Sequence, residues 1–313
     1  MQIASVDQEQ QFVKTLPSKW PQFVKEIIPS LDAEKHKGQC GRIAVVGGSF
    51  EYTGAPYFSA MSSLRAGVDM AHIFCEDSAA TAIKTYSPEL IVHPILKARC
   101  EPGQSIEETS RHLANQVAEW LSSLHSVVIG PGLGRNPLIL ETVACIIEEV
   151  TKRQIPVVID ADGLYLVSVK PHVLENVAST VVLTPNVVEF NRLTRAFGID
   201  DTSNAETRLR ALAKSVCPGA IIVQKGPKDL IAAARSNMVV HCEEEGSFRS
   251  AWMHLNRNST PSSEWFIPVY SACAMTRRCS LQAFKRKQRS MLTTDIIEEI
   301  SKEFNTVFPL SSL

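Results

Sequence analysis

Apolar runs recur along the chain, and most of them are short and rich in valine and isoleucine. Because these runs are almost continuously apolar, we expect strands that are buried on both faces. Polar segments with helical spacing separate them, which is typical of an α/β protein whose mostly parallel central sheet is flanked by helices on both faces. The predicted strands are Arg42–Gly48, Met70–Phe74, Leu90–Leu96, Ser126–Gly130, Pro156–Ile159, Thr180–Leu183 and Ala220–Val223.

Two of the segments between these strands have clear helical spacing, Ile106–Leu124 and Leu138–Arg153. A shorter amphipathic segment around Trp20–Leu31 predicts a further helix. We expect this helix to lie in an N-terminal extension, residues 1–34, and to pack on a main domain that spans residues 35–313.

The pattern changes after Asp229. The sequence LIAAARSNMVVHCE, residues 230–243, is typical of two strands joined at Ser236–Asn237, so we expect a late β-hairpin. The chain then closes with two predicted helices, Tyr270–Arg286 and Asp295–Val307, with Thr293 or Thr294 as the N-cap of the second.

The composition is that of an ordinary globular protein, with 44% hydrophobic and 21% charged residues among 313. A formal net charge of -1 gives no electrostatic footprint for nucleic acid, and no apolar run is long enough to span a bilayer. The basic run Lys285, Arg286, Lys287 and Arg289 is interpreted as a solvated helix end, with an anion patch as the alternative. We therefore expect neither nucleic acid nor a membrane as a partner, and a homo-oligomer stays open.

The 8 cysteines contain no CxxC pair, so neither a zinc site nor a thioredoxin-like motif is indicated. Several lie inside apolar runs, as expected of small buried residues in a reducing compartment. The acidic residues Asp7 and Glu9 argue against a transit peptide. These observations favour a cytoplasmic protein, and a mitochondrial isoform made from another start stays open.

The carboxyl ends of the strands are where the chemistry of a parallel sheet gathers. The first strand leads into GGSFEYTGAP, which is either a tight turn that lets backbone approach a ligand or a plain strand-to-helix turn. The fourth leads into GPGLGR, where Gly130, Gly132 and Gly134 leave main-chain amides that could hold an anion before a helix. This loop is not the dinucleotide fingerprint GxGxxG, which would need a glycine in place of Arg135.

Three later strand ends carry charged or amide side chains. In VIDADGL, Asp160 and Asp162 could orient a cation or cap a helix. In TPNVVEF, Asn186 and Glu189 fit a capping box, and the functional alternative is that both hold hydrated Mg²⁺ through water. In VQKGPKDLI, Lys225 can meet a phosphate, although no Walker A loop is present.

The order of these signals is more informative than any one of them. GG…YTGAP, GPGLG, DADG, TPNxxEF and VQKGxxD follow one another here, and in this order they resemble the NAD(P)H-hydrate dehydratase family, which has a ribokinase-like fold. The resemblance runs from about His36 to Asp229 and resumes near Tyr270. The closing sequences YSACAMTRRC and TTDIIEEI look like those of the eukaryotic, ATP-dependent members.

The resemblance implies nicotinamide nucleotide repair, in which ATP-dependent dehydration with Mg²⁺ returns the S form of hydrated NADH or NADPH to NAD(P)H, giving ADP and phosphate. ATP phosphorylates the hydroxyl group on the hydrated ring, and phosphate then departs. Asn186 and Glu189 would organise Mg²⁺ through water. By the same resemblance, the hydrate would contact Gly132, Gly134, Asn186, Val187, Val188, Glu189, Phe190, Asn191 and Arg192. ATP would contact Lys225, Gly226, Pro227, Lys228 and Asp229.

One element of the family pattern is absent from the sequence. In the family a GGQGD turn follows the hairpin; its amides form an anion hole and its Asp is the base toward the hydroxyl group. This chain contains no GxGD, and no Asp occurs between Asp229 and Asp295. Gly246–Arg249 resemble the approach to the turn, and the match then stops. We therefore assign no catalytic residue and expect residues 250–269 to be irregular or disrupted.

Four interpretations of this departure stay open. A working dehydratase could use a divergent base, for which the candidates are Glu243, Glu244, Glu245 and Glu264. A splice variant or a misread exon after Arg249 would leave a chain of this family with little or no turnover. A non-catalytic variant would still bind nucleotide or NAD(P)H hydrate. A small-molecule kinase of the same fold also needs the GxGD aspartate, so the sequence argues against it equally.

Overall fold

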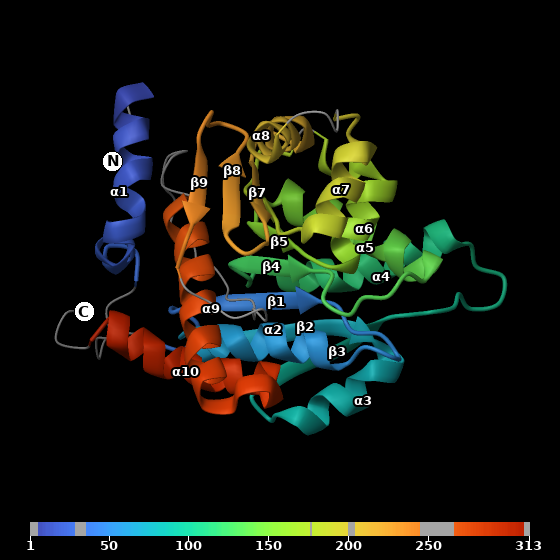
Figure 1. The fold of residues 1–313 in the computed structure, drawn as a ribbon. Helices are drawn as coiled ribbons and strands as arrows, with labels where there is room; N and C mark the ends of the chain where they lie inside the picture. The colour runs from blue at the N-terminus through green and yellow to red at the C-terminus, as the bar shows by residue number, and fades with distance from the viewer. Residues whose placement is uncertain (1–5, 29–35, 176, 200–203, 245–265, 310–313) are drawn as a thin grey trace.

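The computed structural model describes residues 6–28, 36–175, 177–199, 204–244 and 266–309, and within them the central element is a nine-stranded sheet (Figure 1). The strand order is β3-β2-β1-β4-β5-β6-β7-β8-β9. Strands β1 to β7 run parallel, and β8 and β9 are antiparallel additions at one edge. The strands are β1 (Arg42–Val46), β2 (Met70–Glu76), β3 (Leu90–Leu96), β4 (Ser126–Ile129), β5 (Val157–Ile159), β6 (Val181–Leu183), β7 (Ala220–Gln224), β8 (Asp229–Ala233) and β9 (Val239–Cys242).

Helices cover both faces of this sheet (Figure 1). One face carries α4 (Ile106–Leu121), α5 (Pro137–Lys152), α6 (Asp162–Val169), α7 (Val187–Ala196) and α8 (Ala205–Val216). The other carries α2 (Gly54–Arg65), α3 (Asp77–Tyr86), α9 (Phe266–Lys287) and α10 (Thr293–Val307), with α1 (Val6–Lys25) packed outside α9. None of the described helices is long and apolar enough to cross a membrane. The predicted α/β layering and the late hairpin are confirmed.

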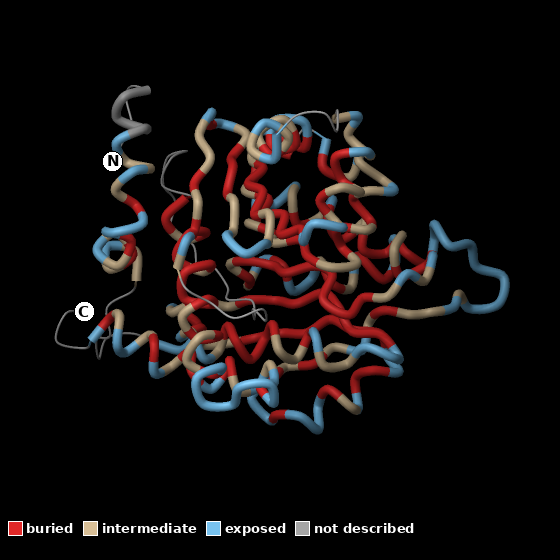
Figure 2. The backbone as a smooth tube through the Cα atoms, in the orientation of Figure 1, coloured by how far each residue is buried: buried red, intermediate tan, exposed pale blue. Residues whose placement is uncertain are grey.

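Strand β1 shows why the apolar runs are continuous. Ile43 and Val45 point into the cluster formed with α2 and α3, whereas Ala44 and Val46 point into the cluster on the opposite face. All four side chains are at most 1% exposed. Since successive residues of a strand face opposite sides, burial of both faces requires an apolar residue at every position. Figure 2 shows the resulting buried band through the middle of the molecule.

The N-terminal helix lies earlier in the sequence than predicted. It spans Val6–Lys25 instead of the segment around Trp20–Leu31. Leu16 and Trp20 are fully or almost fully buried in the cluster that α9 contributes to. The Trp20 ring also meets the edge of Phe308, with ring centroids 5.9 Å apart. Packing of this helix on the body of the protein is therefore as predicted, although its bounds are not.

The C-terminal helices differ from the prediction at their starts. Helix α9 begins at Phe266, so residues 266–269, which were expected to be irregular, form its first turn. The rest of the segment expected to be irregular, 250–265, lies outside the described residues. Helix α10 begins at Thr293, so neither Thr293 nor Thr294 is its N-cap. Instead the backbone N–H of Leu292 donates to the Asp295 carboxylate at 2.7 Å, because this acidic side chain reaches back over the first turn.

The basic run at the end of α9 is exposed, as expected of a helix end. Arg286 forms an ion pair with Glu299, and the Lys287 ammonium lies 3.7 Å from the Asp295 carboxylate. These contacts tie α9 to α10.

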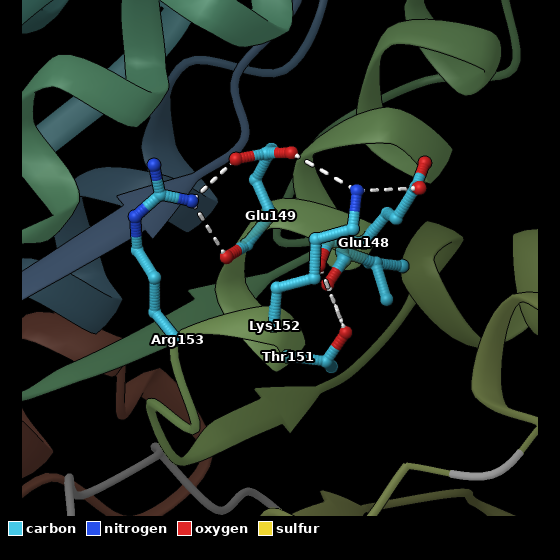
Figure 3. A network of polar contacts seen from close by, with 6 residues as sticks. Glu148, Glu149, Thr151, Lys152 and Arg153 are labelled. Atoms are coloured by element: carbon cyan, nitrogen blue, oxygen red, sulfur yellow. Dashed lines mark hydrogen bonds and ion pairs between the residues drawn. The ribbon is translucent and has the colours of Figure 1, made fainter.

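The last turn of α5 carries a separate polar network (Figure 3). Lys152 pairs with Glu148 at 2.8 Å and with Glu149 at 3.4 Å, and Arg153 pairs with Glu149. The hydroxyl of Thr151 donates to the Glu148 carbonyl at 3.1 Å. Basic side chains at a helix C-terminus complement the helix dipole, but exposed pairs of this kind contribute at most about 1 kcal/mol. Helix α5 has 16 residues and is therefore about 24 Å long, so this network lies far from the strand-end loop where the helix begins.

Candidate functional site

The loops after β1 and β4 lie against each other, at the point where the strand order of the sheet reverses. The Gly48 N–H donates to the Pro131 carbonyl at 3.1 Å, and the Ser49 hydroxyl donates to the Gly132 carbonyl at 3.0 Å. A Cβ on Gly47 would lie 2.2 Å from the Pro131 oxygen, so the approach needs a glycine. The sequence singled out these two loops separately, and the fold joins them.

The loop from Gly130 to Gly134 is fixed by the strand end beside it. Gly130 has φ +119°, and a Cβ there would lie 1.9 Å from the Asp160 carbonyl oxygen. The Gly134 N–H donates to the Asp162 carboxylate at 3.1 Å. An anion at the Gly134 amide would therefore have to take the place of that carboxylate.

The DADG segment after β5 sends its two carboxylates to different partners. Asp160 accepts from Lys225 Nζ at 2.9 Å and from the Thr184 hydroxyl at 3.0 Å, while Asp162 also pairs with Arg135 at 3.2 Å. Between them, Ala161 has φ 49° and ψ -118°, a conformation that L-residues rarely adopt. Strain of this kind is typical of functional sites, where the surrounding structure holds it. With respect to α6, Asp160 lies just before the helix and Asp162 lies in its first turn. The N-cap residue is Ala161, which makes no side-chain capping hydrogen bond.

Helix α7 begins with the capping box that the sequence predicts. The Asn186 side chain accepts from the N–H groups of Val188 and Glu189, and the Glu189 carboxylate accepts from the Asn186 N–H at 2.8 Å. Burial raises the pKa of Glu189, and the nearby charge of Asp160 acts in the same direction, against the opposing effect of Lys225. The ends of β5, β6 and β7 thus form one group of interacting charges.

The other residues predicted to contact the hydrate lie in different environments. Val187 and Val188 are exposed, at 53% and 68%. Phe190 is 1% exposed and belongs to the core, so its side chain positions α7. Asn191 accepts from the Arg208 guanidinium at 3.1 Å. Arg192 lies 5.6 Å from the centre of the Tyr165 ring.

Tyr165, in α6, connects the two predicted hydrate-binding segments. Its ring lies 4.3 Å from the guanidinium carbon of Arg135 and 5.6 Å from that of Arg192. Cations over an aromatic face are attracted to it. The glycine loop and α7 are therefore neighbours, and Tyr165 holds an arginine from each.

The turn predicted to contact ATP, Gly226–Asp229, is held by Arg277 of α9. The Arg277 guanidinium donates to the Gly226 carbonyl at 2.7 Å, to the Pro227 carbonyl at 2.7 Å and to the Asp229 carboxylate at 2.8 Å. Asp229 also accepts from the Gly226 N–H at 3.3 Å. The three groups that accept from Arg277 are thus held by the nitrogens of one rigid, planar guanidinium, so Arg277 sets the shape of this turn.

Two of the candidate bases are described. Glu243 pairs with Lys228 at 2.7 Å, an exposed contact that lowers the pKa of Glu243 and so weakens it as a base. Glu244 accepts from the Trp20 indole N–H at 3.4 Å. Glu245 and Glu264 lie outside the described residues, as does the Gly246–Arg249 segment.

Sequence reasoning missed Tyr165 and Arg277. Tyr165 lies three residues after Asp162, so the two side chains lie on the same side of α6. This spacing suggests a role for Tyr165 only once the DADG motif is known to border a site. Arg277 had a clearer signal, since it lies in the middle of a predicted helix, next to Arg278 and close to the apolar residues Ala274 and Met275. A charge in that position requires a partner.

Comparisons with known proteins agree on one family. A sequence model described as NAD(P)H-hydrate dehydratase matches residues 43–251. The ATP-dependent (S)-NAD(P)H-hydrate dehydratase of Mus musculus is 41% identical over 306 residues, covering 92% of this chain and 85% of the mouse protein. The human protein of the same name is 41% identical over 310 residues, covering 92% of this chain and 84% of the human protein.

Solved structures show the same fold. A ribokinase-like superfamily protein of Enterococcus faecalis has a TM-score of 0.67 at 15% identity, covering 92% of this chain and 94% of that one. The ADP/ATP-dependent NAD(P)H-hydrate dehydratase of Bacillus subtilis, co-crystallised with ATP and Mg²⁺, has a TM-score of 0.57 at 17% identity and covers 91% of this chain and 97% of that one. The predicted ribokinase-like fold is thereby confirmed.

Proposed function

The chain belongs to the NAD(P)H-hydrate dehydratase family, and we propose that its strand-end site binds the S form of hydrated NADH or NADPH together with ATP for nicotinamide nucleotide repair. In this reaction the γ-phosphoryl group of ATP goes to the hydroxyl of the hydrated ring. The bond between the ring carbon and that oxygen then breaks, so phosphate leaves with the former hydroxyl oxygen, a ring proton is lost, and the products are NAD(P)H, ADP and phosphate. One observation supports the assignment: Lys225 pairs with Asp160 at 2.9 Å, and its backbone N–H donates to the carbonyl of Pro185, next to Asn186, at 2.8 Å.

The residues on the two sides of Lys225 suit the two substrates. On one side, Gly132, Gly134 and the segment from Asn186 to Arg192 would hold the hydrate, and the exposed Val187 and Val188 offer apolar surface to its ring. On the other side, Lys225 and Gly226–Asp229 would hold ATP. An ammonium group at the boundary favours the charge that develops on a phosphoryl group in transfer.

The site fits a Mg²⁺ ion that enters with ATP. Among the described residues no three carboxylate, histidine or cysteine side chains lie together as a metal cage. Mg²⁺ keeps several waters and is commonly held by one or two carboxylates and by substrate phosphates. Glu189, whose neighbours are Lys225 and Asp160, would hold it through water with the side chain of Asn186. The bound ion would neutralise phosphate charge during transfer.

The absent GxGD turn limits what this chain does with its substrates. The family match ends at residue 251, two residues after the point where the resemblance stops. The alignment with the mouse protein extends over 306 residues, but 92% of this 313-residue chain is only about 288 residues. Within the aligned region the mouse protein therefore has residues without a counterpart here. Loss of a single oxyanion donor lowers kcat by about 10²–10³-fold. Without the amides and the aspartate together, we expect turnover at least about 10³-fold lower than in the mouse enzyme.

Two measurements test this proposal. Calorimetry with ADP and Mg²⁺, and with the hydrate of NADH, should show binding of both, while turnover of the hydrate with ATP stays near background. A chimera that carries the GGQGD segment of an intact relative between Arg249 and Phe266 should gain turnover. Absence of hydrate binding would refute the proposed substrate, and turnover equal to that of the mouse enzyme would refute the loss of catalysis.

We also propose that the protein works in a reducing compartment such as the cytoplasm. Its support is that all 8 cysteines are free thiols. Burial raises the pKa of Cys75 and of Cys279 to about 12, so these thiols are poor nucleophiles.

A further inference from the structure

A cavity of about 740 Å³ opens at the carboxyl ends of β1 to β4. It borders the glycine loop through Leu133 and Gly134, and it continues over the loop after β1 and the start of the loop that follows β3. Much of the loop after β3 is exposed (Figure 2). Cavities of this size hold ligands as large as a nucleotide. The proposed function leaves it without an occupant.

We propose that this cavity holds the adenosine half of the dinucleotide hydrate, an inference that rests on the proposed function. The reacting ring must face ATP, and the ATP turn follows β7. Since the glycine loop follows β4, the half of the substrate remote from the reaction has to extend away from β7, towards β1, β2 and β3. The cavity lies on that side of the loop.

Phe50 and Glu76 give the cavity the chemistry that an adenosine needs. Phe50 is 73% exposed and lines the cavity, so its ring is available to stack on a base. Glu76 also lines the cavity although it is only 7% exposed, and its carboxylate accepts from the Phe50 N–H at 3.0 Å. One side chain thus orients the aromatic residue and presents a carboxylate, the group that accepts hydrogen bonds from a ribose diol.

The charges of the cavity favour the hydrate of NADH over that of NADPH. The basic side chains that line it are largely matched: Lys97 pairs with Asp77 at 2.7 Å, and Arg135 pairs with Asp162 at 3.2 Å. The remaining acidic lining comes from Glu51, Glu76 and Glu101, against Arg99. A 2′-phosphate carries almost two negative charges, which this acidic surplus repels. The 2′-hydroxyl of NADH carries none.

The test is a set of calorimetric titrations in the presence of saturating ADP and Mg²⁺, which occupy the ATP turn. The probes are the S hydrates of NADH and NADPH, the hydrate of reduced nicotinamide mononucleotide, which lacks the adenosine half, and AMP. The wild-type chain should bind NADH hydrate about tenfold more tightly than NADPH hydrate. The variant Phe50→Ala should weaken NADH hydrate about tenfold and leave the mononucleotide hydrate unchanged. The variant Glu76→Gln should reduce the difference between NADH and NADPH hydrates.

The matched control is Glu89→Gln, which removes one carboxylate just before the amino end of β3, at the opposite end of the strand from the cavity, and should alter neither affinity. If neither Phe50→Ala nor Glu76→Gln changes the affinity for the dinucleotide hydrates, the inference is overturned while the proposed substrate stays in place. Equal losses for the mononucleotide and the dinucleotide in Phe50→Ala would overturn it too. If no hydrate binds but AMP binding depends on Phe50, the proposed function fails and the adenosine site stands.

Discussion

Replacement of Arg277 should separate the stability of the ATP turn from its ability to bind nucleotide. Arg277 is 9% exposed, and its partner Asp229 has a side chain that is 13% exposed. The variant Arg277→Met fills a similar volume but leaves the Asp229 carboxylate without its cation and two carbonyl groups without their donor. Breaking a buried ion pair from one side costs about 3–5 kcal/mol. Because this pair is not completely buried, we expect a loss of about 3 kcal/mol in the free energy of unfolding.

Two further variants identify the cause of that loss. Arg277→Lys keeps the charge but not the fork, so it should lose about two hydrogen bonds, or about 2 kcal/mol. In the double variant Arg277→Met with Asp229→Asn, the unpaired charge is gone. It should recover about half of the lost stability, but its affinity for ADP should stay low, since the carbonyl groups of Gly226 and Pro227 remain without the donor that shapes the turn.

Urea unfolding gives the stabilities, and calorimetry with ADP and Mg²⁺ gives the affinities. The matched control is Arg153→Met, which breaks an exposed pair at the far end of α5 and should change stability by less than about 1 kcal/mol without any effect on ADP binding. The reasoning is refuted if Arg277→Met costs less than about 1 kcal/mol. It is equally refuted if the double variant binds ADP as tightly as the wild-type chain, because the turn would then hold its shape without the arginine.

Three further predictions concern the scaffold. Burial, with the neighbouring charges of His72 and Lys84, lowers the pKa of His93 to about 4, so its contribution to stability is complete above pH 6.5 and is lost as the pH falls towards 4. Urea unfolding should record a loss of about 2 kcal/mol over that range, smaller in His93→Gln but unchanged in His112→Gln; an identical loss in His93→Gln would contradict the assignment. Gly130→Ala should cost more than about 3 kcal/mol, because its Cβ would meet a carbonyl oxygen at 1.9 Å, whereas Gly103→Ala meets nothing within 4 Å and should cost about 1 kcal/mol; equal losses in thermal unfolding would contradict this. Ala161→Gly removes the strain of φ 49° and should stabilise the fold by about 1 kcal/mol, and a lower unfolding midpoint would show that the strain is absent.

Features set by local patterns were predictable from the sequence, and features set by distant partners were not. The continuous apolar run of β1 predicts that both of its faces are buried. The capping box of α7 involves residues only three positions apart. By contrast, Asp160 and Lys225 are 65 positions apart, and Arg277 lies 48 positions from Asp229. No periodicity encodes those pairs, because they depend on how β5, β7 and α9 dock on one another.

The N-terminal helix shows the same limit from another direction. Helix α1 continues through Pro17 and Pro21, where local rules expect a break. Burial of Leu16 and Trp20 against the body of the protein outweighs that preference, so the helix forms earlier in the sequence than its local pattern indicates. Tertiary packing commonly overrides local propensity in this way.

The positions of these groups also separate binding from catalysis. Lys225 follows β7, Asp160 follows β5 and Arg277 lies in α9. Within the part of the chain that the structure describes, Lys225 pairs with Asp160 and Arg277 pairs with Asp229. On the proposed function, we expect the substrate contacts to persist in a chain that lacks the anion hole and the base. If the turn acts only on the transition state, restoring it in the chimera should raise kcat while the affinities for ADP and hydrate stay constant. If the affinities rise together with kcat, the turn also organises the ground-state site, and the strand-end residues are not sufficient for binding.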